Sequence, residues 1–189
     1  MKKIFSQLIL FMLVLTMTST VFAAKATPDQ QRAELNEMSG KVLERMYQKY
    51  PSAQEAVQEA YAYCTISASS VKWGFWGDDH GRGVAVNNRT GERIYVKMKE
   101  VSLGINFGAK EYDLLFIIAN ETAWDKFVSG KINFGSETSA DVTDGVNGVT
   151  YAGATTTAEG VQVYQLDKKG LAVEATFKGG RISPYRTLN

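Results

Sequence analysis

Residues 113–128 have the sequence DLLFIIANETAWDKFV, which combines a strand pattern and a helix pattern. Leu114–Ala119 form an uncharged run without polar alternation, which is typical of a strand covered on both faces. Asn120 is a favourable helix N-cap, and Glu121–Val128 follow with Trp124 on an apolar face at helical spacing. The stretch therefore predicts a central strand that leads into a short inserted helix.

Outward from this stretch, the chain beyond residue 65 is rich in Val, Ile, Thr, Phe and Tyr and carries sixteen of the seventeen glycines. Such composition predicts short strands punctuated by turns. The predicted strands are residues 70–76, 83–88, 92–100, 102–109, 113–119, 131–142, 149–158, 160–166 and 170–177. Their regular spacing favours an antiparallel meander closed toward a barrel or sandwich.

Two amphipathic helices are expected before this body. Thr27 and Gln30 form a capping-box pattern, and an apolar stripe then recurs at helical spacing until Pro51 ends the first helix. Ser52 opens a second, shorter helix with an apolar face that extends to Cys64. Acidic and basic residues alternate on the polar sides, which favours packing against the body over a basic membrane-surface helix.

These patterns predict an α+β fold, predominantly antiparallel β, with a barrel-like or sandwich body, two N-terminal helices and one short inserted helix. We expect one domain over residues 27–189, divided into a helical front (27–64) and a β-rich body (65–189). No fixed-period repeat or long linker interrupts this span.

The first residues have the pattern of a signal peptide. Lys2 and Lys3 precede the apolar run Ile4–Leu15, and Val21 and Ala23 fit the −3 and −1 positions of a cleavage site. We expect cleavage after Ala23, hence a signal peptide over residues 1–23 and a periplasmic or secreted protein that can lie peripheral to a membrane. The alternative is an uncleaved anchor, because residues 4–24 are uncharged and long enough to span a bilayer.

Charge and cysteine content exclude several classes of protein. The 189 residues carry a formal charge of +1, and loss of Lys2 and Lys3 leaves 19 basic against 20 acidic residues, so no nucleic-acid partner is expected. Cys64 is the single cysteine, which excludes an internal disulfide and favours a small buried hydrophobe over a reactive thiol. No cofactor and no structural metal are implied.

Catalytic motifs are scarce. His80 is the only histidine and lies beside Asp78 and Asp79, which could form a metal or acid–base site but have the composition of a solvated turn. No Gly-x-Ser-x-Gly elbow is present. We therefore expect a protein that is not an enzyme.

An aromatic and basic cluster remains as the candidate binding site. Its members are Lys72, Trp76, Arg82, Lys97 and Lys99. Trp76 ends a predicted strand beside a polar loop, where an indole could lie at a lipid headgroup boundary while the cations meet phosphate. The alternative for Trp76 is a half-buried side chain under the loop, and the neighbouring Trp73 and Phe75 are expected in the core.

Two stretches resemble the SYLF lipid-binding domain family. SLGINFGAKEYDLLFIIANETAWDKFVSGKINFGSETSADV (102–142) is similar to its glycine-bearing strand, apolar strand and Ala-x-x-x-Phe helix. VYQLDKKGLAVEATFKGGRI (163–182) is similar to its tyrosine strand and closing glycine-rich strand. In all, the resemblance extends over residues 53–189. The segment WGFWGDDHGRGVAV (73–86) is bulkier and more acidic than the family's glycine-rich hairpin.

The resemblance implies a non-enzymatic, envelope-associated protein that binds lipid in an apolar cavity or at a surface patch. The alternative is a periplasmic structural or partner-binding protein that supports the cell envelope without a lipid ligand. A lipid or membrane surface is thus the expected partner and an envelope protein the second, while the sequence does not define the oligomeric state.

Overall fold

The computed structural model describes residues 26–74, 76–100, 106–134, 154–158, 160–168 and 180–189. The helices of these residues are α2 (Pro28–Lys49), α3 (Ser52–Glu59) and α4 (Glu121–Val128). None of them is long and apolar enough to cross a bilayer. They match the two N-terminal helices and the inserted helix that the sequence predicts.

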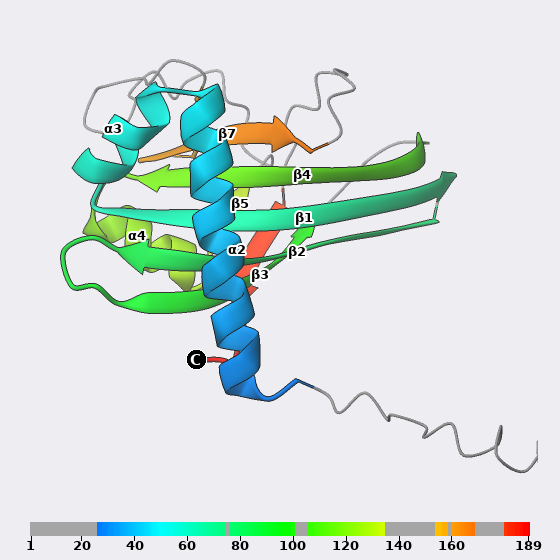
Figure 1. The fold of residues 1–189 in the computed structure, drawn as a ribbon, viewed down its shortest axis with the longest axis horizontal. Helices are drawn as coiled ribbons and strands as arrows, with labels where there is room; N and C mark the ends of the chain where they lie inside the picture. Colours follow the sequence, from blue (N-terminus) through cyan, green and yellow to red (C-terminus); the bar gives the residue numbers. More distant parts are fainter. Residues whose placement is uncertain (1–25, 75, 101–105, 135–153, 159, 169–179) are drawn as a thin grey trace, which may run out of the picture.

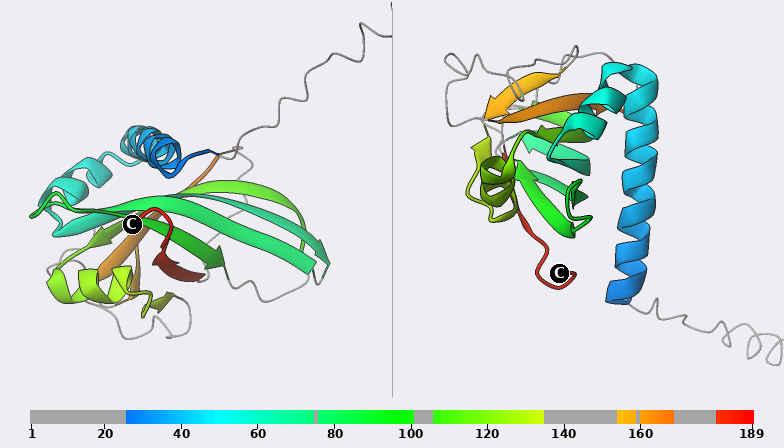
Figure 2. Two further views of the ribbon diagram at one scale, coloured as in Figure 1. Left: turned by 90° about the horizontal axis from the view of Figure 1, so that it is seen from below. Right: turned by 90° about the vertical axis from the view of Figure 1, so that its left-hand side faces the viewer.

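Eight strands are described, and they form one sheet. They are β1 (Ala62–Gly74), β2 (Trp76–Asn87), β3 (Arg93–Glu100), β4 (Asn106–Ile118), β5 (Asn133–Phe134), β6 (Thr155–Ala158), β7 (Val161–Asp167) and β8 (Gly180–Pro184). Their order is β5-β8-β3-β2-β1-β4-β7-β6, and every described pairing is antiparallel. The sheet is strongly curled, which confirms the α+β fold with a barrel-like body (Figures 1 and 2).

The strand order departs from the expected meander after β3. β1, β2 and β3 are neighbours in sequence order, but β4 pairs with β1 and β7. The reason is visible in β4, where Leu114 and Phe116 pack on one face of the sheet and Leu115 and Ile117 on the other. A strand that is apolar on both sides is buried best in the middle of the sheet, as the sequence predicts.

Several predicted boundaries are corrected. The helical front ends at Glu59, and Cys64 lies in β1, where it is fully buried as expected of a small hydrophobe. The predicted turn around His80 is part of β2, because residues 76–87 pair continuously with β1. Residues 102–109 and 113–119 share one strand, β4, as far as they are described. The predicted strand 170–177 lies outside the described residues.

Two apolar cores lie on opposite faces of the sheet. On the inner face, α4 packs Trp124 and Phe127 against Ile66, Leu114 and Phe116. On the outer face, α2 and α3 cover one half of the sheet, and α2 crosses the strands while β1, β2 and β4 extend beyond it (Figure 1). The other half of the outer face is left uncovered by α2.

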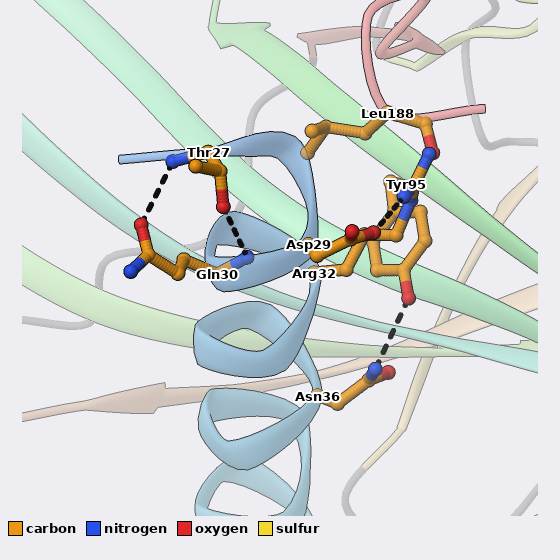
Figure 3. A network of polar contacts seen from close by, with 7 residues as sticks. All are labelled: Thr27, Asp29, Gln30, Arg32, Asn36, Tyr95 and Leu188. Atoms are coloured by element: carbon orange, nitrogen blue, oxygen red, sulfur yellow. Dashed lines mark hydrogen bonds and ion pairs between the residues drawn. The ribbon is translucent and has the colours of Figure 1, made fainter. Parts of the chain in front are cut away.

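Helix α2 begins with the predicted capping box. The Gln30 amide donates to Thr27 Oγ1 at 3.3 Å, and the Thr27 amide donates to Gln30 Oε1 at 2.9 Å (Figure 3). Further along, Arg32 Nε donates to the Leu188 carbonyl at 2.8 Å, and Asn36 Nδ2 donates to the Tyr95 hydroxyl at 3.0 Å. These bonds fasten α2 to β3 and to the segment that follows β8.

The segment that follows β8 is held on β3 by the side chain of Asn189. The Tyr95 amide donates to Asn189 Oδ1 at 2.8 Å, and Asn189 Nδ2 donates to the Tyr95 carbonyl at 2.9 Å. Leu188 is buried beside Leu35 and Val84. The carboxamide of Asn189 therefore takes both backbone hydrogen bonds that a neighbouring strand would make.

Candidate functional site

The uncovered half of the outer face carries four basic side chains on three neighbouring strands. Arg82 on β2 is the register partner of Lys97 on β3, and Lys99 on β3 is the partner of Arg181 on β8. Register partners share a face, and Val84, two residues from Arg82, packs against α2. All four are exposed. We call this group of four residues the outer basic face.

The arrangement places like charges directly opposite one another twice. Opposed side chains on antiparallel strands have Cβ atoms about 4.5 to 5.5 Å apart, where like charges are destabilising. No acidic side chain among the described residues lies within ion-pair distance of these four cations. The positive charge of the outer basic face is therefore available to an external anion.

One of the cations has a defined position. Lys97 Nζ lies 3.7 Å from the centroid of the Tyr185 ring, a cation–π contact. The Tyr185 amide donates to the Tyr95 carbonyl at 2.8 Å, which anchors the ring beside β3. The ammonium group is thus held beside the sheet surface.

The buried acid of the described residues, Asp113, is already paired with basic side chains. Asp113 on β4 is fully buried, and its Oδ2 accepts hydrogen bonds from Arg45 Nε at 2.9 Å and Nη2 at 2.6 Å. Its Oδ1 has no hydrogen bond but lies 3.4 Å from Lys168 Nζ, which donates to Ser67 Oγ at 2.6 Å. These contacts tie α2 to β4, so this cluster is structural.

The structure brings together three of the five predicted site residues. Arg82, Lys97 and Lys99 belong to the outer basic face. Lys72 and Trp76 lie at the far end of the β1–β2 hairpin, where residue 72 pairs with residue 77. Arg82 lies six positions after Trp76, which is about 20 Å along a strand. Their side chains, like those of Trp73 and Phe75, lie outside the described part of the chain.

Sequence reasoning missed Arg181, the fourth member. It is distant in sequence from the other three and becomes a neighbour of Lys99 only because β8 pairs with β3. The local signal is weak: in GRISP, an exposed Arg alternates with a buried Ile, which indicates a strand with one solvent-facing side but no partner for it.

The other candidate groups have simple environments. His80 is exposed and is the register partner of Lys99. Among the described residues, no three His, Cys, Asp or Glu side chains gather as a metal site would require. Burial raises the pKa of the Cys64 thiol well above its ordinary value, which disfavours the reactive thiolate.

The inner face is closely packed where it backs the outer basic face. A Cβ added at Gly83 would lie 2.1 Å from the Thr65 carbonyl oxygen and 2.7 Å from Ile66 Cγ1. One added at Gly81 would lie 2.7 Å from Ile66 Cγ2 and 3.3 Å from Met98 Cε. These two glycines admit the Ile66 side chain against the β2 backbone, so apolar side chains fill this part of the inner face.

Comparison with known proteins finds a family match for the C-terminal part of the chain. Residues 99–189 match the Ysc84 family model, which is described as "Las17-binding protein actin regulator". Beta cell expansion factor A of Aeromonas veronii is 28% identical over 162 residues, which cover 82% of this chain. The chain spans 58% of that relative's length. Both motif-bearing stretches lie within the matched region, so the predicted resemblance to the SYLF family is confirmed over residues 99–189.

Proposed function

We propose that this chain is an exported, non-enzymatic protein that binds anionic lipid at a membrane surface through the outer basic face. The observation that carries the proposal is the double opposition of Arg82 with Lys97 and of Lys99 with Arg181 on an exposed sheet surface. Such an arrangement costs folding free energy unless an anion accompanies it. Export is proposed from the signal-peptide pattern of residues 1–23.

Surface binding is favoured over an internal cavity. Ile66 occupies the space over Gly81 and Gly83, and Trp124 and Phe127 of α4 pack on the inner face. An acyl chain in that region would have to displace these side chains. The outer basic face, by contrast, is accessible without any rearrangement.

Flotation with vesicles tests the proposal. The mature protein, residues 24–189, is mixed with neutral or anionic vesicles at low and at moderate salt. We expect it to float only with anionic vesicles, and less at moderate salt, because exposed charge pairs are screened over about 10 Å at 0.1 M. Equal flotation with neutral vesicles would contradict the role of the cations, and no flotation with any lipid would overturn the proposal.

A second function is favoured by the family description, which names a protein partner, Las17, for the family. On this alternative the outer basic face binds an acidic segment of an envelope protein without a lipid ligand. Failure to float together with saturable binding of an acidic peptide would support it.

A further inference from the structure

The side of α2 that faces away from the sheet carries a glycine that the fold does not require. Gly40 lies near the middle of this 22-residue helix, where glycine is among the least favourable residues. A Cβ added at Gly40 would meet nothing within 4 Å, whereas one added at Gly83 would collide with the Thr65 carbonyl oxygen. Figure 2 shows α2 at the edge of the molecule, with the sheet on one side of it. The missing side chain allows a second backbone to approach α2 closely from outside.

Two charges of opposite sign flank Gly40. Glu44 is exposed and lies about 6 Å from Gly40 along the helix axis, toward the C-terminal end. Arg93 of β3 is exposed and is held at the equivalent position on the other side of Gly40, because its Nη1 donates to Asn36 Oδ1 at 2.9 Å. Neither charge makes an ion pair with another described residue. One cation and one anion thus lie symmetrically about the glycine.

The same symmetry continues one turn further from Gly40. Ala33 lies seven residues before it and Tyr47 seven residues after it, a spacing that keeps both on its stripe of the helix. Ala33 is exposed. The Tyr47 ring packs partly against the outer-face core, while its hydroxyl makes no hydrogen bond with another described residue. A small side chain at one end of the stripe therefore corresponds to a projecting aromatic edge at the other end.

This surface is complementary to itself under one symmetry. In two antiparallel helices related by a two-fold axis at Gly40, a position before Gly40 faces the position equally far after it in the other helix. Arg93, bound to Asn36, then meets Glu44 of the partner subunit, and Ala33 makes room for the partner's Tyr47. A parallel crossing would instead oppose Glu44 to its own copy, and Arg93 to its own copy. Charge thus selects the antiparallel arrangement.

We infer that a second copy of this chain docks on the outer side of α2, through a two-fold antiparallel crossing of the two helices at Gly40. Every contact of this dimer occurs twice, including the ion pair of Arg93 with the partner's Glu44. The contact lies on the flank of α2 opposite to that of Arg45, which bonds Asp113. It does not use the outer basic face, so the inference is independent of the proposed function.

Charge reversal tests the pairing. Sedimentation velocity of the mature protein, residues 24–189, over a range of concentrations should show a reversible monomer–dimer equilibrium. Arg93→Glu and Glu44→Arg each place two like-charge pairs in the dimer, and each should raise the dissociation constant about tenfold or more. The double variant Arg93→Glu/Glu44→Arg restores opposite charges and should recover most of the affinity, which a misfolded variant could not do.

A control for the charge change lies on the same helix. Glu34 is exposed and, at six residues from Gly40, points about 120° away around the helix. Glu34→Arg changes the charge of α2 as Glu44→Arg does, and it should leave the dissociation constant unchanged.

An introduced cysteine locates the two-fold axis. Cys64 is the single cysteine of the chain and is fully buried, so a thiol placed at position 40 reacts alone. Gly40→Cys should give a disulfide-linked dimer under mild oxidation, because the axis brings the two Cα atoms within the about 7 Å that a disulfide requires. Glu34→Cys, treated in the same way, should stay monomeric.

The contrary outcomes are distinct. A protein that stays monomeric at every concentration, with Gly40→Cys not cross-linked, would overturn the dimer. A dimer whose dissociation constant is unchanged by both charge reversals uses another surface and would also overturn the inference. Weakening by each single reversal without recovery in the double variant would overturn the pairing of Arg93 with Glu44, and with it the antiparallel crossing.

Discussion

The two halves of the outer sheet face differ in whether their charged side chains are paired with opposite charges. Under α2, the one buried carboxylate of the described residues, Asp113, is compensated by Arg45 and Lys168, and apolar side chains surround the rest of the helix contact. Beyond α2, the outer basic face opposes cation to cation twice. The comparison teaches that charges of the first kind stabilise the fold, whereas those of the second kind oppose like charges at a cost in stability, which we propose an external anion offsets.

The largest effect is expected in the covered half. Arg45→Met removes the two hydrogen bonds to Asp113 Oδ2 and leaves a buried charge with Lys168 alone. We expect a loss of about 3 kcal/mol in the free energy of unfolding, measured by urea denaturation. Lys41→Gln, which breaks the exposed pair with Glu37, is the control and should change little. A small effect of Arg45→Met would remove the distinction between the two halves.

A smaller loss in the free energy of unfolding is expected where the segment after β8 contacts the covered half. Asn189→Ala removes two hydrogen bonds to the backbone of Tyr95, while Leu188 can remain in its apolar site. We predict a loss of about 1 to 2 kcal/mol, because both bonds satisfy partly buried backbone groups. Chemical denaturation measures it, and hydrogen exchange at the Tyr95 amide should rise in parallel. Unchanged exchange would show that water replaces the side chain without cost.

The side of α2 that faces away from the sheet should tolerate change. Gly40 is exposed within the helix, and an added Cβ would meet nothing within 4 Å. Gly40→Ala should therefore raise the free energy of unfolding by about 0.5 to 1 kcal/mol, since glycine costs that much in a helix interior. Destabilisation in a thermal melt would indicate a contact on this side that the structure does not contain.

The smallest effect, with the opposite sign to Arg45→Met, is expected in the uncovered half. Lys99→Glu replaces the repulsion with Arg181 by an attractive cross-strand pair. We predict a gain of about 0.5 kcal/mol, which should diminish in high salt. If the free energy of unfolding fell on removal of a cation from the uncovered half, as we expect for Arg45→Met in the covered half, the outer basic face would not be unfavourable for folding.

The sequence was informative where a pattern is local. Leu114–Ala119 identified the central strand because both faces are apolar, and Thr27 with Gln30 identified the start of α2. The end of the second helix was placed too late, because the apolar residues before Cys64 fit a helix face as well as a strand. Only pairing with β2 and β4 decides between them.

The site was predictable to the extent that its residues lie near one another in sequence. Arg82, Lys97 and Lys99 belong to one hairpin, so a shared surface could be expected from the strand periods alone. Arg181 joins them through a long-range pairing of β3 with β8, which no local signal specifies. Trp76 was grouped with them because a turn was expected at residues 77–81, whereas β2 runs straight through and separates the two positions.

The central claim is that the outer basic face, and not the positive charge of the chain in general, binds anionic membranes. The most direct measurement is flotation of the double variant Arg82→Gln/Lys99→Gln beside Arg89→Gln/Lys126→Gln, which removes the same charge from exposed positions elsewhere. We predict that the first loses partition into anionic vesicles about 25-fold, at about fivefold for each cation, while the second binds as the unaltered protein does. Equal losses in the two double variants would contradict the account.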